Sequence, residues 1–258
     1  MNPPAQGLRV LVTAGAAGIG KALATTFADA GARIFICDID QAALDALRAT
    51  NSLIGSCVAD VAEPAQVDAL FDAATAFLGG LDVLINNAGI AGPTAPVEAI
   101  AIAEWNRTIA VDLNGMFYCT RRAVPLLKKA GGGSIINLSS VAGRLGFPLR
   151  TPYAAAKWAV VGFTKSLAME LGPSNIRVNA IQPGMVEGER IERVISAKAK
   201  ALGVSFDDHK QQLLSKISLR RSVSAQDIAN MALFLATEAG RNISGQALSV
   251  CGNVESLV

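Results

Sequence analysis

The stretch RVLVTAGAAGIG (9–20) decides the fold class of this chain. Its first five residues form the short β-branched and aliphatic run that is typical of a buried strand, and Gly15, Gly18 and Gly20 follow. Glycines at this spacing allow a tight turn into a helix, and they let a pyrophosphate approach the helix N-terminus, where free N–H groups favour an anion. The stretch therefore predicts a strand, a phosphate-binding turn and a helix.

Strand-like and helix-like segments alternate along the rest of the chain. Further strands are expected at 33–37, 53–59, 81–86, 134–139, 176–181 and 246–250, with helices at 20–30, 103–130 and 152–171 and others beginning near 40 and 64. Such alternation implies a parallel sheet with right-handed crossovers. We expect a Rossmann-like, doubly wound α/β fold, with seven parallel strands and helices on both faces, in one domain spanning 1–258. The polar stretch 185–222 fits a substrate lid or insertion.

Composition excludes several classes of function. Of 258 residues, 51% are hydrophobic and 17% charged, which suits a parallel sheet covered by helices. The net charge is only +2 and there is no stripe of basic residues, which argues against nucleic-acid binding. The sequence contains no apolar run of about 18 residues, so a membrane span is not predicted. The four cysteines are far apart, so we interpret them as small core residues in a reducing cytoplasm. The only histidine, His209, falls in a polar segment expected to be solvated, and no metal site is predicted.

Asp38 points to the identity of the cofactor. It closes the second expected strand, eighteen residues after Gly20. A carboxylate there can accept hydrogen bonds from an adenosine ribose and would repel a 2′-phosphate, which favours NAD over NADP. No Lys or Arg lies in the turn before Gly18 to attract such a phosphate. The alternative is a helix N-cap, because Asp38 and Asp40 both precede a helix.

Tyr153 and Lys157 form a candidate catalytic pair. They are four residues apart on an expected helix, so they share one face. A phenol, with a pKa near 10, is a poor acid–base group at neutral pH, but a nearby ammonium favours the phenolate. Ser139 and Ser140 end the fifth expected strand, at the sheet edge where ligands bind. A serine hydroxyl there can hydrogen-bond a reacting oxygen.

The motifs that carry a family resemblance are the glycine-rich turn, NNAG (86–89), SS (139–140), YAAAK (153–157) and PG (183–184). Through them the chain resembles the short-chain dehydrogenase/reductase family over nearly its whole length. The resemblance implies that Tyr153 is the general acid/base, that Ser140 polarises the carbonyl, and that Lys157 binds the nicotinamide ribose and favours the phenolate. It also implies a homotetramer built through the long helices and the C-terminal strand. The residues it places around NAD are Gly15, Gly18, Ile19, Gly20, Asp38, Asp60, Val61, Asn87, Ala88, Gly89, Tyr153, Lys157, Pro183, Gly184 and Val186.

The chain departs from the family pattern at several positions. Ala14 stands where a glycine is usual, and we expect Gly15 to take over the turn. Asp112 occupies the register of a catalytic asparagine, and we expect it to keep that role through its backbone carbonyl. Asn114 lies about 200° further round a helix and cannot substitute for it. Gly188 stands where a threonine often contacts the carboxamide.

Three arginines bear on the substrate. Arg144 and Arg150 lie between the catalytic serine and tyrosine, and Arg190 lies on the expected lid. Guanidinium groups recognise anionic or polyhydroxylated molecules, although surface or subunit contacts are the alternative interpretation. These residues, with the charged lid, predict a small polar substrate: a hydroxy acid, a sugar acid or a polyol.

The sequence thus predicts an enzyme that transfers a hydride between NAD(H) and a secondary alcohol or its ketone. Two alternatives remain open: an NADPH-dependent 3-oxoacyl reductase, and an NAD-binding protein with little turnover. A hydrolase is disfavoured, because a GxSxG elbow is missing and there is a single histidine.

Overall fold

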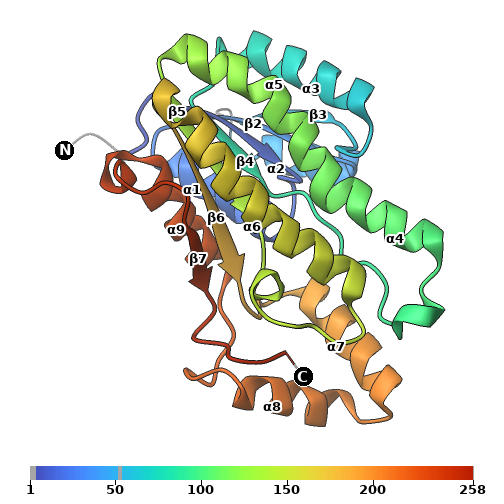
Figure 1. Cartoon of the computed structure of the whole chain (residues 1–258). Coiled ribbons are helices and arrows are strands. Elements are labelled where there is room, and N and C mark those ends of the chain that lie inside the picture. The colour runs from blue at the N-terminus through green and yellow to red at the C-terminus, as the bar shows by residue number, and fades with distance from the viewer. Residues whose placement is uncertain (1–3, 52–53, 258) are drawn as a thin grey trace.

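A computed structural model describes residues 4–51 and 54–257, and its centre is a seven-stranded parallel sheet. The strand order is β3-β2-β1-β4-β5-β6-β7. Strands β2 and β3 are added on one side of β1, and β4 to β7 are added on its other side. This doubly wound arrangement confirms the predicted fold class (Figure 1). The strands are β1 (Arg9–Thr13), β2 (Arg33–Asp38), β3 (Ile54–Val58), β4 (Val83–Asn86), β5 (Gly133–Leu138), β6 (Ile176–Pro183) and β7 (Ala247–Val250).

The observed strands lie within two residues of the predicted bounds. Leu53, which the sequence analysis assigns to the third strand, lies outside the described residues. The helices are α1 (Gly18–Asp29), α2 (Gln41–Arg48), α3 (Pro64–Leu78), α4 (Ile102–Ile109), α5 (Gly115–Ala130), α6 (Thr151–Leu171), α7 (Glu189–Leu202), α8 (Phe206–Ser215) and α9 (Ala225–Ala236), with short helices η1 (Val97–Ala99), η2 (Ala110–Asn114), η3 (Val141–Gly143), η4 (Gly172–Ser174) and η5 (Glu238–Gly240).

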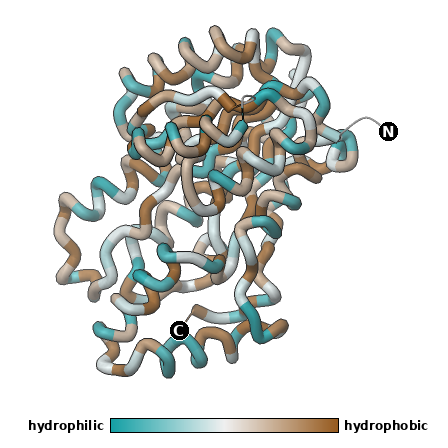
Figure 2. The backbone as a smooth tube through the Cα atoms, turned by 180° about the vertical axis from the view of Figure 1, so that it is seen from behind, coloured by the Kyte–Doolittle hydropathy of each residue, from teal (hydrophilic) through white to brown (hydrophobic). Residues whose placement is uncertain are grey.

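Strand alternation creates a hydrophobic core on each face of the sheet. Val10 and Val12 of β1 pack in the core beneath α1, α2 and α9, whereas Leu11 points into the core beneath α3 and α5. Because both faces are covered, the central strands are buried throughout and read as continuous aliphatic runs. The helices are amphipathic, and Figure 2 shows hydrophobic and hydrophilic residues alternating along them. None of the helices in the described part of the chain is both long and apolar enough to cross a membrane.

One helical segment is irregular at a position that concerns the site. The predicted helix over 103–130 is formed by α4 and α5, joined by a π-helical turn at η2. Such turns are rare and often occur at functional sites. Because the π-helical turn is wider than an α-helical turn, the angle of about 200° between Asp112 and Asn114 does not apply to it. The two side chains still differ in environment, since Asp112 is buried and Asn114 is exposed.

The stretch 185–222 forms a helical insertion at the carboxyl ends of the strands. It contains α7 and α8, which lie beyond the arrowhead of β6 in Figure 1. Its two ends are joined, because Val186 pairs with Val223 and the Glu187 N–H donates to the Val223 carbonyl at 3.0 Å. The expectation of a solvated His209 is wrong: this residue of α8 is completely buried. A helix with one apolar face buries whichever residue lies on that face.

Candidate active site

The glycine-rich turn leaves the N-terminus of α1 open to a ligand. Ala17, the N-cap, has no side chain that could bond the free N–H groups, and the first turn contains no acidic residue. A Cβ on Gly18 would meet nothing within 4 Å, whereas one on Gly20 would lie 1.9 Å from the Ala14 carbonyl oxygen. Gly20 therefore lets α1 pack closely against the turn, and the space beside Gly18 suits a pyrophosphate.

Ala14 itself adopts the left-handed conformation of the turn, with φ of 51°. The expectation that Gly15 takes over this conformation is wrong, because Gly15 has no positive φ. Gly15 serves the packing instead, since a Cβ there would lie 2.6 Å from the Ile36 side chain. Asn87 braces the turn by donating from Nδ2 to the carbonyls of Thr13 at 3.0 Å and Ala14 at 2.9 Å.

Asp38 lies beside this turn at the end of β2. Its carboxylate accepts from the backbone N–H of Ala16 at 3.1 Å and of Ile39 at 2.8 Å. The helix N-cap is Asp40, which accepts from the Ala43 N–H at 3.0 Å. The N-cap interpretation therefore applies to Asp40, and Asp38 presents a half-buried carboxylate next to the open helix N-terminus. This arrangement fits the adenosine ribose and pyrophosphate of NAD.

The other residues expected around the cofactor line the same edge of the sheet. Asp60, which follows β3, is already engaged: it accepts from Arg107 Nη2 at 2.7 Å and from the Ala62 N–H at 2.9 Å. Val61 is buried against Gly115. Pro183 ends β6, and Gly184 donates to the Val250 carbonyl at 3.0 Å, so β7 supports this loop.

The two serines at the end of β5 have different roles in the structure. Ser139 Oγ donates to the Lys157 carbonyl at 2.8 Å, which fixes α6 to the strand. Ser140 Oγ accepts from the Ala142 N–H at 3.1 Å and donates no hydrogen bond to the described residues. The Ser140 hydroxyl proton is therefore available to a substrate oxygen, in agreement with the choice of Ser140 from the sequence.

Tyr153 and Lys157 lie together on α6, as predicted. Lys157 Nζ is 5.5 Å from the centroid of the Tyr153 ring, and Lys157 is buried while Tyr153 is partly accessible. Nζ also donates to the Leu138 carbonyl at 3.1 Å. The lysine is thus held by the end of β5, with its charge close to the phenol.

Asp112 contacts Lys157 directly through its side chain, which the sequence analysis did not predict. Its Oδ2 lies 3.2 Å from Lys157 Nζ, and its Oδ1 accepts from the Ile90 N–H at 2.7 Å. Both side chains of the ion pair are almost fully buried. A Cβ on Gly89 would lie 3.2 Å from Nζ and 3.3 Å from Oδ2, so the glycine makes room for the pair.

The three arginines assigned to the substrate all donate to backbone carbonyls. Arg144 Nη2 bonds Val254 at 2.6 Å and so braces the C-terminal segment. Exposed Arg190 bonds Gly89 at 2.9 Å and ties α7 to the loop after β4. Arg150 bonds Ala91 at 2.5 Å, and its Cζ is 5.3 Å from the centroid of the Tyr153 ring. Of the three, Arg150 alone has its guanidinium over the Tyr153 ring.

Sequence reasoning missed two residues of this region. Phe147 contacts Arg150, and Lys198 of α7 is buried with its Nζ 4.9 Å from the Phe147 ring centroid. Neither residue belongs to a motif that the sequence analysis considered.

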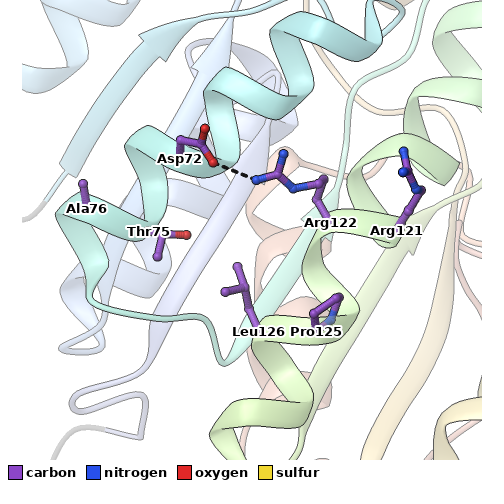
Figure 3. Close-up of a pocket in the computed structure, with 7 residues that line it drawn as sticks. All are labelled: Asp72, Thr75, Ala76, Arg121, Arg122, Pro125 and Leu126. Atoms are coloured by element: carbon purple, nitrogen blue, oxygen red, sulfur yellow. Dashed lines mark hydrogen bonds and ion pairs between the residues drawn. The ribbon is translucent and has the colours of Figure 1, made fainter.

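A surface hollow of about 490 Å³ lies elsewhere, between α3 and α5 (Figure 3). None of the candidate site residues lines it. Arg122 in its wall forms ion pairs with Asp68 at 2.5 Å and Asp72 at 2.7 Å, so its charge is already compensated. Within the described residues, no three side chains of His, Cys, Asp or Glu come together to hold a metal.

Comparisons with known proteins agree with this geometry. A family model described as enoyl-(acyl carrier protein) reductase matches residues 14–253. The chain is 39% identical to trans-4-hydroxycyclohexanecarboxylate dehydrogenase of Sinomonas cyclohexanicum, over 94% of this chain and 90% of that protein. It is 36% identical to 3-oxoacyl-(acyl-carrier-protein) reductase of Thermotoga maritima, over 96% and 98%. A solved 7α-hydroxysteroid dehydrogenase, complexed with NADH and 7-oxo glycochenodeoxycholic acid, superposes with a TM-score of 0.89 at 33% identity, over 98% and 96%.

Proposed function

Because this chain belongs to the short-chain dehydrogenase/reductase family, an oxidoreductase family that acts on alcohols and ketones, we propose that it is an NAD-dependent dehydrogenase of a small polar secondary alcohol. The observation that carries the proposal is the cluster at the ends of β5 and α6. There, Ser140 offers a free hydroxyl proton, and Tyr153 lies beside the Lys157 ammonium.

This cluster is suited to moving one proton at a substrate oxygen. Ser140 donates a hydrogen bond to that oxygen and fixes its position. Tyr153 takes the alcohol proton during oxidation and returns it to the carbonyl oxygen during reduction. Lys157 stabilises the phenolate form by its charge and is placed to hold a ribose hydroxyl. Bound NAD supplies the hydride acceptor, and the hydride leaves the carbon that bears the alcohol.

The preference for NAD rests on Asp38. Its carboxylate lies beside the turn, and the segment 13–20 contains no cation that could compensate a 2′-phosphate. The solved relative with bound NADH supports this choice. The competing proposal, an NADPH-dependent 3-oxoacyl reductase, is supported by the Thermotoga relative. The charge at Asp38 is the feature that opposes it.

A small substrate with a carboxylate or several hydroxyls is supported by Arg150, whose Cζ lies 5.3 Å from the centroid of the Tyr153 ring. The hydroxy acid in the name of the Sinomonas relative supports the same class. We assign residues 185–222 to a lid over this substrate, within one domain that spans the chain. The four free cysteines, three of them buried, support a reducing cytoplasm as its location.

We also propose a homotetramer assembled through the long helices. Large apolar side chains are exposed on the outer surface of α5 and α6: Phe117 is 49% exposed, Trp158 52% and Met169 84%. Clustered apolar surface of this kind is typical of a protein interface. Sedimentation of the purified protein measures the state, and a monomer at micromolar concentration would contradict the assembly.

The function is tested by oxidation kinetics on a panel of hydroxy acids, sugar acids and polyols, read at the NADH absorbance. We expect turnover with NAD, weaker turnover with NADP, and a loss of all but a few per cent of the rate in Tyr153→Phe. NAD binding of that variant, measured by calorimetry, should stay close to wild type because the phenol acts on the substrate. A preference for NADP, or a Tyr153→Phe variant that keeps its rate, would refute the cofactor or the mechanism respectively.

A further inference from the structure

The guanidinium of Arg150 is buried without an ion-pair partner among the described residues. The residue is 2% exposed, and none of the described carboxylates forms an ion pair with it. One hydrogen bond, to the Ala91 carbonyl, uses Nη2. Nε and Nη1 are buried and have no partner in the described part of the chain. An isolated buried cation with unused donors is unfavourable, so the arrangement needs an external acceptor.

A second buried cation contacts the same ring as Arg150. Lys198 is 3% exposed, and its Nζ donates to the Leu257 carbonyl at 3.0 Å. Nζ is 4.9 Å from the Phe147 ring centroid, and Arg150 Cζ is 5.1 Å from it. Burial lowers the pKa of both groups, and the charge of Arg150 lowers the pKa of Lys198 further. An anion that reaches both groups would accept from the free donors of Arg150 and offset this repulsion.

The location of Arg150 connects this anion to the reaction. Its guanidinium stacks on the Tyr153 ring, which carries the catalytic phenol, at 5.3 Å. An anion bound by Nε or Nη1 therefore lies within the length of a small molecule from the phenol oxygen. Arg144 also has a buried Nε without a partner in the described chain, but its guanidinium braces Val254 and contacts the ring of neither Tyr153 nor Phe147 among the described residues.

The surroundings of the site are apolar where the lid and the C-terminal segment meet. Val141, Ile217, Cys251 and Val254 form a small buried cluster, against which Met185 and Leu214 among others pack. The charged groups of α7 point mostly to solvent, with Glu189 90% and Arg193 76% exposed in their side chains. Lid charge is therefore no argument for a polyhydroxylated substrate. Such an apolar wall favours a hydrocarbon body over hydroxyls in the part of the substrate that meets it.

We propose that Arg150 and Lys198 bind the carboxylate of the substrate, and that this substrate is a hydroxycarboxylate with an apolar body between its hydroxyl and its carboxylate. The proposal rests on the proposed function for the position of the hydroxyl. Because Arg150 is buried beneath Phe147 and Lys198, entry of the substrate requires α7 to move away from Phe147. Sugar acids and polyols, whose hydroxyls would face the apolar wall, are excluded by this assignment.

The test uses a matched pair of probes that cannot react: cyclohexanecarboxylate and the neutral cyclohexanecarboxamide. Calorimetry on the full chain, with and without saturating NAD, measures both dissociation constants. We expect the carboxylate to bind about 10- to 100-fold more tightly than the amide, as charge-assisted hydrogen bonds to a guanidinium allow. Arg150→Met, which has no charge and similar length, should abolish that preference.

Two further variants make the result specific. Lys198→Met, on the lid, should lower the carboxylate preference severalfold, and it provides an independent test where Arg150→Met does not fold. Arg144→Met removes a neighbouring cation that braces the C-terminal segment, and it should leave the ratio of the two dissociation constants unchanged. Equal binding of both probes by wild type, no binding of either, or a preference that survives in Arg150→Met would overturn the proposal. A ratio unchanged in Lys198→Met would remove Lys198 from the site.

The outcome is separable from that of the proposed function. Oxidation of the neutral alcohol cyclohexanol, followed at the NADH absorbance, depends on Tyr153 and needs no carboxylate site. Turnover of cyclohexanol without a carboxylate preference would refute the anion site and leave the dehydrogenase standing. A carboxylate preference in a protein that oxidises no alcohol would refute the dehydrogenase and leave the anion site standing.

Discussion

Replacement of Asp112 by asparagine tests how this chain holds the lysine of the candidate site. The two carboxylate oxygens of Asp112 face two different donors: Oδ1 accepts from the Ile90 N–H at 2.7 Å, and Oδ2 forms an ion pair with Lys157 Nζ at 3.2 Å. An asparagine side chain has one acceptor oxygen and one NH₂ group. Whichever way the amide is turned, its NH₂ faces a donor. We therefore expect Asp112→Asn to be destabilising, although asparagine is the usual residue in the family at this register.

The size of the effect follows from the separation and burial of the pair. Two unit charges 3.2 Å apart attract by about 5 kcal/mol at an effective dielectric constant of about 20. The loss of one partner of a buried pair typically costs about 3–5 kcal/mol. We expect about 3 kcal/mol for Asp112→Asn, because the amide oxygen can keep the hydrogen bond from the Ile90 N–H. For a protein of this size, that corresponds to a fall in Tm of about 6–12 °C.

The assay is thermal and urea unfolding at neutral pH and a fixed protein concentration, for wild type, Asp112→Asn, Lys157→Met and the double variant. In the Lys157→Met background the ion pair is already lost, so Asp112→Asn should cost much less there than in wild type. A coupling energy of about 2 kcal/mol or more is expected from this cycle. A Tm of Asp112→Asn within about 2 °C of wild type, or a coupling energy near zero, would show that the pair does not hold the lysine.

Three further predictions concern the cofactor, the serines and stability. Asp38→Asn, which keeps the size of the side chain and removes its charge, should raise the KM for NAD roughly tenfold and lower the KM for NADP; an unchanged ratio in steady-state kinetics would disprove the role of the charge. Ser139→Ala and Ser140→Ala each remove one buried hydrogen bond and should both lower Tm, but Ser140→Ala should lower kcat far more; a larger loss of kcat in Ser139→Ala would exchange their assignments. Burial raises the pKa of the Asp82 carboxyl, but the hydrogen bonds and charge of Arg9 outweigh it and hold that pKa below its usual range. The folded state therefore binds this proton less readily than the unfolded chain, so the stabilisation is present at neutral pH and is lost as pH falls below about 4. The Tm difference between wild type and Asp82→Asn should shrink over that range, and a constant difference would contradict the linkage.

The sheet could be predicted from the sequence because its local signals agree. Each central strand is an aliphatic run, because both of its faces are covered, and turns or helix patterns separate the runs. The helices of 185–222 were not predicted individually. Their stability comes from packing one narrow face against the C-terminal segment, and a mostly polar sequence gives little periodic signal for such a face.

The candidate site was predictable where spacing along one element determines contact. Tyr153 and Lys157 share a face of α6, and Ser140 ends a strand at the ligand edge. Contacts between distant segments were not predictable. Lys198 reaches Phe147 from an insertion, and the expectation of a solvated His209 failed because the side of α8 that faces the protein is a tertiary property.

The position of Lys157 shows why the departures from the family pattern need not abolish activity. Its backbone carbonyl accepts from Ser139, its Nζ donates to Leu138, and Asp112 holds the same Nζ from the π-helical turn between α4 and α5. The end of β5 and the π-helical turn, which are distant in sequence, thus hold the ammonium group 5.5 Å from the centroid of the Tyr153 ring. A carboxylate presents two acceptor oxygens, so Asp112 accepts from Ile90 with one and pairs with the lysine through the other, which ties the loop after β4 to Lys157. The substitution therefore exchanges one way of positioning the lysine for another, and Ser140 and Tyr153 are left in place.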